Sequence, residues 1–334
     1  MNNIFLIHTE YHLLTTFRVI FDKYKDDNNF IYIASEHRIQ GEIKSSLPNV
    51  HTRRLPHINY GVYSTLKEFE ILNPKNFFFF QDNSSDNIYL SYHLNKLNVN
   101  VALVQDGLKP YPIWHRRFLL LNCLKETFEF YKQMFRRWAV IPTLFIKSYK
   151  YGKLRFINQL WVDYPNKLPY IPNKKEIIPI PLLNDDVVIE VSRIFKFKPS
   201  VPLNNIILYI GQPIRSKLLR KREIKIIKEI ISNNQDKPFL FKKHPNISQE
   251  QLSLYDEIAG FSYLEDIVPA ELIIASMKDS IIVSRYSTAL ITNNPNCRFY
   301  WTHRLYNNVE VLSQLEIINP TSHITEVNDI AEIK

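Results

Sequence analysis

Apolar stretches of strand length alternate along this chain with segments whose apolar residues recur at the helical spacing of three or four. In the first half, strands are predicted at Asn3–His8, Phe30–Ala34, Asn76–Phe80 and Asn100–Val104, and helices at Leu13–Phe21, Ile39–Ser46, Ser64–Leu72 and Ser85–Leu97. This alternation predicts parallel sheets with helices on both faces, and therefore an α/β fold class. In such open sheets, ligands bind beyond the carboxyl ends of the strands.

A proline-rich stretch between Tyr164 and Pro202 interrupts the pattern, apart from a helical patch at Asp185–Phe195. The pattern then restarts with strands at Asn205–Ile210, Phe239–Lys242, Ser280–Val283 and Arg298–Trp301, helices at Lys217–Asn233 and from Ser287, and a strand or buried helix end at Leu272–Ala275. The 334 residues exceed the roughly 250–300 at which single cores stop growing. We therefore predict two Rossmann-like, doubly wound domains, 1–180 and 205–334, joined by a linker at 181–204.

Composition excludes several classes of protein. A hydrophobic content of 45% and a charged content of 22% exclude a disordered or fibrous chain. Cys123 and Cys297 are too few for a disulfide framework or a cysteine metal site, which indicates a reducing compartment. The glycine motifs of dinucleotide and P-loop sites are missing, as is an aspartate pair of the metal-binding kind, so we expect neither cofactor nor metal. Short apolar runs and the lack of a basic leader predict a cytoplasmic protein.

The formal net charge of +9 favours an anionic partner, which could be nucleic acid, phospholipid headgroups or an acidic substrate. One part of the chain mixes basic and aromatic residues: Trp114, Arg116, Arg117, Lys132, Phe135, Arg136, Arg137 and Trp138. Most stretches of this kind are amphipathic helices packed on a core. An interfacial helix at anionic lipid is the functional alternative. Stacking of RNA bases is a third, although no recognised nucleic-acid module surrounds the segment.

Asp106 is the first candidate for catalysis. It follows the predicted strand Asn100–Val104 and precedes Gly107, which places it on a sharp turn. A turn-forming Asp-Gly pair is the plainer interpretation. A general base, however, needs a carboxylate held at the end of a rigid strand, and this position supplies one.

His244 is the second candidate. It follows the predicted strand Phe239–Lys242, and Pro245 after it favours extended backbone at the histidine. A histidine in such a place is often only a surface residue. The adjacent Lys242 and Lys243 favour a phosphate, whose charge His244 could neutralise as the phosphate leaves.

Three further segments of the second half complete the set of candidates. Ser287 and Thr288 precede a predicted helix, where they would serve as a plain N-cap or bind an anion together with the helix amino terminus. Glu271 opens a predicted helix and could accept hydrogen bonds from ribose hydroxyls. Gly211 and Gln212 form a loop in which backbone could approach a ligand closely. Together with Asp106 and His244, these residues could hold a nucleotide-sugar phosphate and deprotonate an incoming hydroxyl.

The chain resembles the bacterial sialyltransferases of GT-B type, especially the lipooligosaccharide sialyltransferases of glycosyltransferase family 52 and the related polysialyltransferases. Those families share an acid-acid-Gly motif, a His-Pro motif and a Ser-Ser or Ser-Thr pair, which match Gln105-Asp106-Gly107, His244-Pro245 and Ser287-Thr288. The opening segment Ile4–Leu13, with His8, Glu10 and Tyr11, also looks like the first strand and loop of the family. The resemblance implies a GT-B fold, in which two Rossmann-like domains face a cleft.

The resemblance also implies roles for these residues. Asp106 would be the base, with His8, Glu10, Tyr11 and Gly107 on the acceptor side. His244 and the Ser287-Thr288 pair, with Gly211, Gln212, Lys243 and Pro245, would bind the CMP phosphate, and Glu271 the ribose. The expected reaction is an inverting, metal-independent transfer of an acidic sugar such as sialic acid from a CMP donor to a hydroxyl of a lipooligosaccharide or capsule glycan.

Several alternatives stay open. The expected location is the inner face of the cytoplasmic membrane, with a homodimer as one alternative for the assembly. A Kdo transferase, a CDP-polyol phosphotransferase and a basic nucleic-acid-binding protein are alternative functions. Gln105 departs from the motif because it replaces the first acid, so the base could be assigned wrongly if that position carries it in related enzymes.

Overall fold

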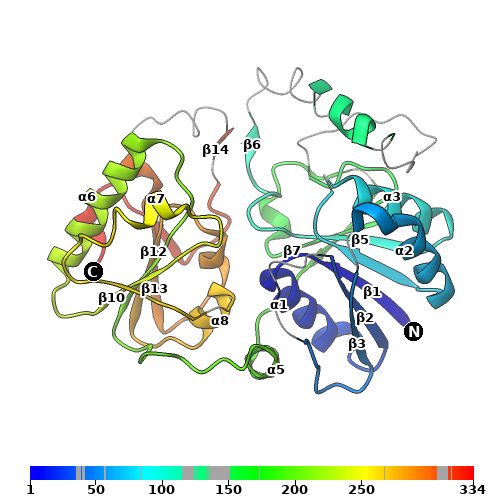
Figure 1. The fold of residues 1–334 in the computed structure, drawn as a ribbon, viewed down its shortest axis with the longest axis horizontal. Coiled ribbons are helices and arrows are strands. Elements are labelled where there is room, and N and C mark those ends of the chain that lie inside the picture. The colour runs from blue at the N-terminus through cyan, green and yellow to red at the C-terminus, as the bar shows by residue number, and fades with distance from the viewer. Residues whose placement is uncertain are drawn as a thin grey trace. The chain divides into compact units, whose positions relative to one another are not determined.

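The computed structural model describes residues 1–34, 39, 42–55, 58–82, 84–114, 124–125, 127–133, 135, 151–172, 174–266, 268–306, 315–316 and 318–334. The chain forms two compact units (Figure 1). Unit 1 comprises Met1–Ile194 with Gln314–Ile318, and unit 2 comprises Phe195–Ser313 with Asn319–Lys334. The division after Ile194 lies inside the stretch predicted as a linker.

Unit 1 is built on a parallel sheet whose described strands follow the order β3-β2-β1-β4-β5-β7-β8. Its strands are β1 (Asn2–Ile7), β2 (Asn28–Ile33), β3 (Val50–Arg54), β4 (Asn76–Phe79), β5 (Asn100–Val104), β7 (Gln159–Val162) and β8 (Glu176–Pro179). The helices are α1 (Glu10–Val19), continued by a π-helical turn at Ile20–Tyr24, α2 (Ile58–Leu72), α3 (Ser85–Lys96), a 3-10 turn at Pro165–Lys167 and α5 (Asp185–Phe195). A short antiparallel pair joins β6 (Ile113–Trp114) to β14 (Leu315–Glu316).

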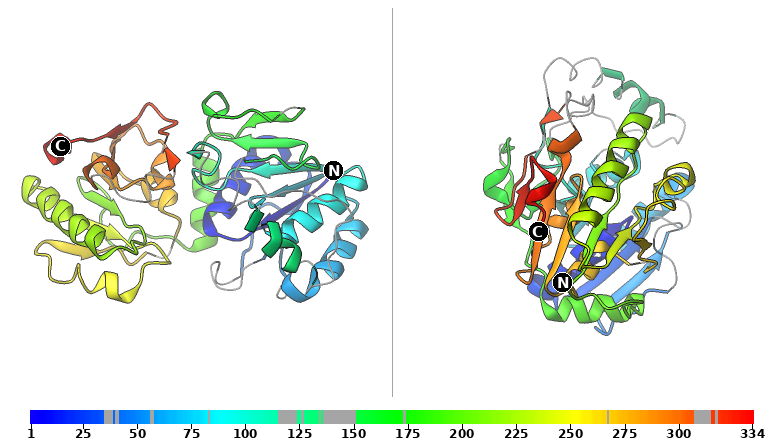
Figure 2. Two further views of the ribbon diagram at one scale, coloured as in Figure 1. Left: turned by 90° about the horizontal axis from the view of Figure 1, so that it is seen from above. Right: turned by 90° about the vertical axis from the view of Figure 1, so that its left-hand side faces the viewer.

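Helices cover both faces of this sheet (Figure 2) because its strands are apolar on both sides. Ile4 and Leu6 of β1 belong to one buried cluster with Phe69 of α2 and Ile88 of α3. Phe5 points to the opposite face, where its ring stacks on Phe78 at 4.5 Å. Each such side chain contributes roughly 1.5–3 kcal/mol through burial, so the sheet centre is the main source of stability in this unit.

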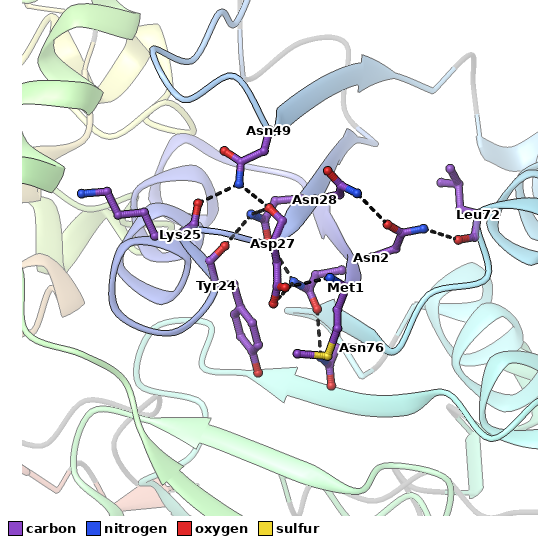
Figure 3. A network of polar contacts seen from close by, with 11 residues as sticks. Met1, Asn2, Tyr24, Lys25, Asp27, Asn28, Asn49, Leu72 and Asn76 are labelled. Carbon is purple, nitrogen blue, oxygen red and sulfur yellow. Dashed lines mark hydrogen bonds and ion pairs between the residues drawn. The ribbon is translucent and has the colours of Figure 1, made fainter.

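Asparagine side chains link the amino ends of the central strands of unit 1. Asn76 donates to Asn3 at 2.8 Å, Asn3 donates to Asn29 at 3.1 Å, and Asn100 donates to Asn76 at 2.9 Å. Around this row, Asn49 and the amino terminus bond to the turn at Asp27 (Figure 3). The amino edge of the sheet is therefore closed by its own polar groups, and the carboxyl edge carries the candidate residues.

Unit 2 is built on a second parallel sheet, with described strands in the order β11-β10-β9-β12-β13-β15. The strands are β9 (Ile207–Ile210), β10 (Phe239–Lys242), β11 (Phe261–Tyr263), β12 (Ser280–Ser284), β13 (Cys297–Trp301) and β15 (Ile324–Glu326). The helices are α6 (Lys217–Asn233), α7 (Gln249–Leu252) and α8 (Ala270–Ala275), with 3-10 turns at Thr288–Ile291, His303–Tyr306 and Ile330–Glu332. Ile226 and Ile230 of α6 pack on Tyr209 and Phe241, whose rings stack at 5.7 Å.

The predicted α/β class is confirmed, and the eight predicted strands all form, as do most of the predicted helices. The helix predicted at Ile39–Ser46 is wrong: residues 42–46 are not helical. Ile39 and Ile43 are buried at helical spacing, but the Thr52 hydroxyl donates to the Ile43 carbonyl at 2.6 Å and holds the segment against β3. The ambiguous Leu272–Ala275 segment is helical. Among the described strands, those not predicted are β3, β6, β7, β8, β11, β14 and β15.

The helix predicted from Ser287 is a single 3-10 turn, Thr288–Ile291. The turn ends because Asn294 reaches back and donates to the carbonyls of Ile274 and Met277 at 2.7 and 2.9 Å, which pulls the chain toward the end of α8. In the described residues, no helix has both the length and the apolar character needed to cross a membrane.

Candidate active site

The order of strands reverses at one point in each sheet, between β1 and β4 in unit 1 and between β9 and β12 in unit 2. Loops diverge at such a switch point, which makes it the usual ligand site of an open α/β sheet. In unit 1, His8 follows β1 and Asp106 follows β5, next to β4. In unit 2, Gly211 and Gln212 follow β9, and Ser287 lies three residues beyond β12. Most of the predicted site residues therefore gather at these two edges.

Asp106 is held by two different partners, one buried and one exposed. Its Oδ1 lies 3.1 Å from Nε2 of the fully buried His12, and its Oδ2 pairs with the ammonium of the exposed Lys109. Burial alone would raise the pKa of Asp106, but the hydrogen bond from His12 and the charge of Lys109 lower this pKa well below its ordinary value. Gly107 follows with a φ of 66°, which lets the chain turn sharply behind the carboxylate.

His12 was not predicted as a site residue. Its ring stacks on Phe80 at 4.1 Å, and its Nδ1 accepts the backbone N–H of His8 at 3.1 Å. Because Nδ1 is an acceptor, the neutral ring carries its proton on Nε2 and donates it to Asp106. Its position four residues after His8, directly before the predicted helix Leu13–Phe21, was the signal that could have identified it.

Gln105 lies next to Asp106 in sequence but has no exposed surface and belongs to a different network. Its Nε2 donates to Asp163 Oδ2 at 2.9 Å, and its Oε1 accepts from the Tyr111 hydroxyl at 2.7 Å and the Asp163 backbone N–H at 2.8 Å. Asp163 Oδ1 in turn accepts from Arg18 at 2.7 Å. The side chain at this position must both donate and accept hydrogen bonds. An amide does both, which explains why glutamine stands where the family motif has an acid.

The other acceptor-side candidates surround the loop after β1. His8 is partly buried, and its Nε2 lies 3.3 Å from the amide nitrogen of the buried Asn87. Tyr11 packs its ring edge against His12 at 6.1 Å. Glu10 stands in the first turn of α1, where an acid is favoured by the helix dipole.

His244 lies exposed beyond β10, and Pro245 after it is exposed as well. Its Nδ1 accepts the backbone N–H of Asn246 at 3.1 Å, so the neutral ring carries its proton on Nε2 and would donate from there. The lysines before it diverge: Lys242 donates to the carbonyl of Asp266, whereas Lys243 lies 3.7 Å from Glu265. The run of three cationic groups predicted from the sequence is thus divided by the alternation of side chains along the strand.

The loop after β12 is ordered by its own hydrogen bonds. Ser287 caps the 3-10 turn by accepting from Ala289 N at 3.3 Å, and its backbone N–H donates to the buried Ser284 at 3.1 Å. Arg285 is nine-tenths buried, with its guanidinium 4.7 Å above the Tyr286 ring. Thr288 starts the turn and is partly buried. With only one turn, the predicted contribution of a helix dipole is largely lost, and the hydroxyls and backbone remain as possible anion ligands.

Gly211 is required by packing. A Cβ on this residue would lie 2.2 Å from Cζ of the buried Phe241, so a ring of the core accounts for the glycine, and a close approach to a ligand stays a prediction. Gln212 follows, and its Oε1 accepts the backbone N–H of Tyr286 at 3.1 Å, which joins the loops after β9 and β12. Glu271 is buried in the first turn of α8.

The family model of the alpha-2,8-polysialyltransferases (POLYST) matches residues 3–297. The chain belongs to this family. No curated protein matches the sequence. Membership of the polysialyltransferase family makes the chain a glycosyltransferase and confirms the resemblance found in its motifs.

Solved structures of similar fold agree with this family. The sialyltransferase from Photobacterium damsela is 14% identical, with a TM-score of 0.55 over 98% of this chain and 81% of that one. The GT-B domain of a sialyltransferase from Photobacterium damselae is also 14% identical, with a TM-score of 0.50 over 90% of this chain and 91% of that one. These likenesses show the fold, which is GT-B as predicted.

Two expectations are not tested by the fold. Among the residues that the structure describes, no three His, Cys, Asp or Glu side chains are grouped as a metal site requires, and independence from metal stays a prediction. Of the basic-aromatic stretch, Arg116, Arg117, Arg136, Arg137 and Trp138 lie outside the described residues.

Proposed function

We propose that this polysialyltransferase-family enzyme transfers an acidic sugar from a CMP-activated donor to a hydroxyl of a bacterial surface glycan, with inversion and without a metal ion. The observation that carries the proposal is the pair of partners on Asp106. Buried His12 fixes Oδ1, while Oδ2 pairs with the exposed Lys109. A carboxylate oriented in this way can accept a proton through Oδ2 without reorganising its support.

The chemistry is a single displacement. The acceptor oxygen attacks the anomeric carbon as the bond from that carbon to the CMP phosphate oxygen breaks, and CMP leaves with the electron pair. The acceptor oxygen becomes strongly acidic as the new bond forms, so even a carboxylate of lowered pKa takes its proton at that stage. Displacement of the Lys109 ammonium from Oδ2 by the acceptor would also remove a charge that lowers the pKa of Asp106.

Unit 2 would bind the nucleotide. His244 would donate from Nε2 to a phosphate oxygen, and the hydroxyls of Ser287 and Thr288 would add hydrogen bonds to the same group. Glu271, buried at the start of α8, is the proposed ribose ligand. These roles rest on the match to the family motifs and on the position of the loops at the switch point of the second sheet.

A panel of CMP-, UDP- and GDP-sugars tests the donor class. A ligand present at 100 times its dissociation constant stabilises the folded protein by about 2.7 kcal/mol, so the right nucleotide gives a clear rise in melting temperature. We expect a selective rise with CMP and CMP-sugars. A rise with CDP-polyols or with UDP-sugars alone would replace the proposal with the corresponding transferase, and a steeply salt-dependent affinity for oligonucleotides would favour the nucleic-acid alternative.

Asp106→Asn tests the base directly. We expect CMP affinity within about twofold of the wild type and turnover lowered roughly 100-fold or more, as loss of a general base should give. The control is Asn98→Asp on an exposed turn of the same unit, which exchanges the same two residue types in the opposite direction and should leave CMP affinity and turnover unchanged. Near wild-type turnover for Asp106→Asn would reject the assignment and leave Glu10 or a histidine of the opening loop as the next candidate.

We propose further that the enzyme acts at anionic membranes. Within residues 124–135, the exposed side chains of Leu124, Phe128 and Phe135 fall on one face at helical spacing, and the exposed Lys132 lies nearby. Replacing Phe128 and Phe135 by serine should reduce sedimentation with anionic vesicles. Leu218→Ser, which removes an exposed leucine of α6, is the control. Equal binding of wild type to neutral and anionic vesicles would reject the idea.

A further inference from the structure

A buried glutamine in unit 2 holds the loop after β9 through its backbone. Residues 211–216 have no regular secondary structure, so their polar backbone groups need partners from elsewhere. Gln251 of α7, with only 1% of its surface exposed, accepts from Ile214 N at 2.9 Å and donates to the Gln212 carbonyl at 3.0 Å. One side chain therefore fixes both sides of Pro213.

The orientation of this amide is set by a buried acid. Glu223 of α6 accepts from the Tyr255 hydroxyl and, at 3.4 Å, from Gln251 Nε2, while Gln251 Nε2 also donates to Tyr255 at 2.8 Å. Tyr209 of β9 donates to the other Glu223 oxygen at 3.1 Å. Because Glu223 and Tyr255 accept from Nε2, the Gln251 oxygen must face Ile214. In this orientation the amide accepts from the Ile214 N–H and donates to the Gln212 carbonyl.

The network continues into the loop after β12. The side chain of Gln212 accepts the backbone N–H of Tyr286, the residue before Ser287. The Arg220 guanidinium also donates to the Ile214 carbonyl at 2.7 Å and pairs with Glu250 of α7 at 3.0 Å. The path Glu223, Gln251, Gln212, Tyr286 thus joins the interior of unit 2 to both loops at its switch point.

We propose that Gln251 is a positioning residue for donor binding. It holds the loops 211–216 and 284–288 in the arrangement that receives the nucleotide, without touching the nucleotide itself. The proposal rests on the proposed function for its ligand, and it names a residue outside the family motifs. A loop that is competent for only part of the time binds with an affinity reduced by that fraction, so the effect is expected in the affinity for donor.

Gln251→Met tests this, because methionine keeps the length of the side chain and removes its hydrogen bonds. The control is Asn234→Leu, which removes another buried amide of unit 2. That amide donates to the carbonyls of Ile230 and Ile333, which lie outside both loops. We expect Gln251→Met to weaken CMP binding about tenfold by calorimetry and to raise the donor KM similarly. Its kcat at saturating donor should stay within about twofold, and Asn234→Leu should lower the melting temperature without changing CMP affinity.

Hydrogen exchange separates failure of this proposal from failure of the proposed function. In Gln251→Met without ligand, amides of 211–216 and 284–288 should exchange faster, whereas in Asn234→Leu they should not. If wild type does not bind CMP but the loops still lose protection, the donor class is wrong and the positioning role stands. Unchanged exchange of both loops, or unchanged CMP affinity in Gln251→Met, overturns the positioning role. Combined with Gln212→Ala, which cuts the same path, the losses should be less than additive.

Discussion

Gln105→Glu restores the acid of the family motif and should cost this protein stability without supplying a base. The amide nitrogen at this position donates to Asp163 Oδ2 at 2.9 Å, so the substitution brings a second carboxylate oxygen to that distance. The side chain has no exposed surface, so water cannot screen the pair. Arg18, at 2.7 Å from the other oxygen of Asp163, offsets only part of the repulsion.

The loss of stability equals the free-energy cost of the less unfavourable of two states: both carboxylates charged, or the introduced acid protonated. Two charges at 2.9 Å repel by about 6 kcal/mol at an effective dielectric constant of about 20. Taking up a proton instead costs about 1.4 kcal/mol per pH unit above the ordinary pKa of about 4.3, or about 4 kcal/mol at pH 7. The introduced acid therefore enters the folded state protonated, with a raised pKa. Stability equals that of wild type below about pH 4.3 and declines as pH rises, reaching a loss of about 4 kcal/mol at pH 7.

Melting temperatures measured from pH 5 to pH 8 test this. At about 2–4 °C per kcal/mol, Gln105→Glu should melt roughly 8–16 °C below wild type at pH 7 and only about 2–4 °C below it at pH 5. Asn98→Asp makes the same chemical change on an exposed turn and should show little of this dependence. A loss under about 1 kcal/mol at every pH would refute the reasoning.

The same substitution decides which position of the motif carries the base. Placed in the Asp106→Asn background, Gln105→Glu should not recover turnover, because the residue is buried against Asp163. Recovery of even about one tenth of wild-type activity would move the base to the first position of the motif.

Other perturbations should have equally specific results. His244→Ala, and separately the double change Ser287→Ala with Thr288→Ala, should weaken CMP binding in calorimetry, and their combination should be non-additive because they share one phosphate; unchanged affinity would make these residues structural. Burial raises the pKa of Glu190, but hydrogen bonds from Arg193, Ser46 and Ser45 lower it to about 2 from 4.5. Glu190→Gln should therefore cost up to about 3 kcal/mol above pH 4.5, with the difference disappearing as pH falls toward about 2 in a series of melting curves. Gly211→Ala should destabilise unit 2 by about 1–3 kcal/mol in chemical denaturation, because its Cβ meets Phe241, whereas an unchanged midpoint would mean that the ring can move aside.

The α/β class and most elements could be predicted because their signals are local. A buried strand such as β5 is a short apolar run, and α6 shows the helical period over its full length, so each can be identified within a window of the chain. Local spacing also misleads when a distant partner decides the structure. Ile39 and Ile43 have the spacing of a helix, but Thr52 holds that segment beside β3.

Candidate site residues could be located along the chain because strand ends and turn residues are visible in sequence. Asp106 and His244 each follow a predicted strand. Within a parallel sheet, the carboxyl ends of the strands lie at the same edge, so each residue could be assigned to the carboxyl edge of its own sheet. What each residue does there was not visible. His12 and Asp106 are 94 residues apart in the chain, and Gln105 and Asp163 are 58 apart. No periodic signal in the sequence pairs residues at such distances.

The sequence by itself therefore determined the α/β class and the order in which chemical groups reach the strand ends, since both depend on residues close together in the chain. The tertiary structure alone decided that His12 orients Asp106, that Gln105 turns inward to Asp163, and that Gln251 grips the loop at Gln212. These pairings depend on where helices pack against sheets and on which buried polar groups then lack water. Each such group must find its partner in space.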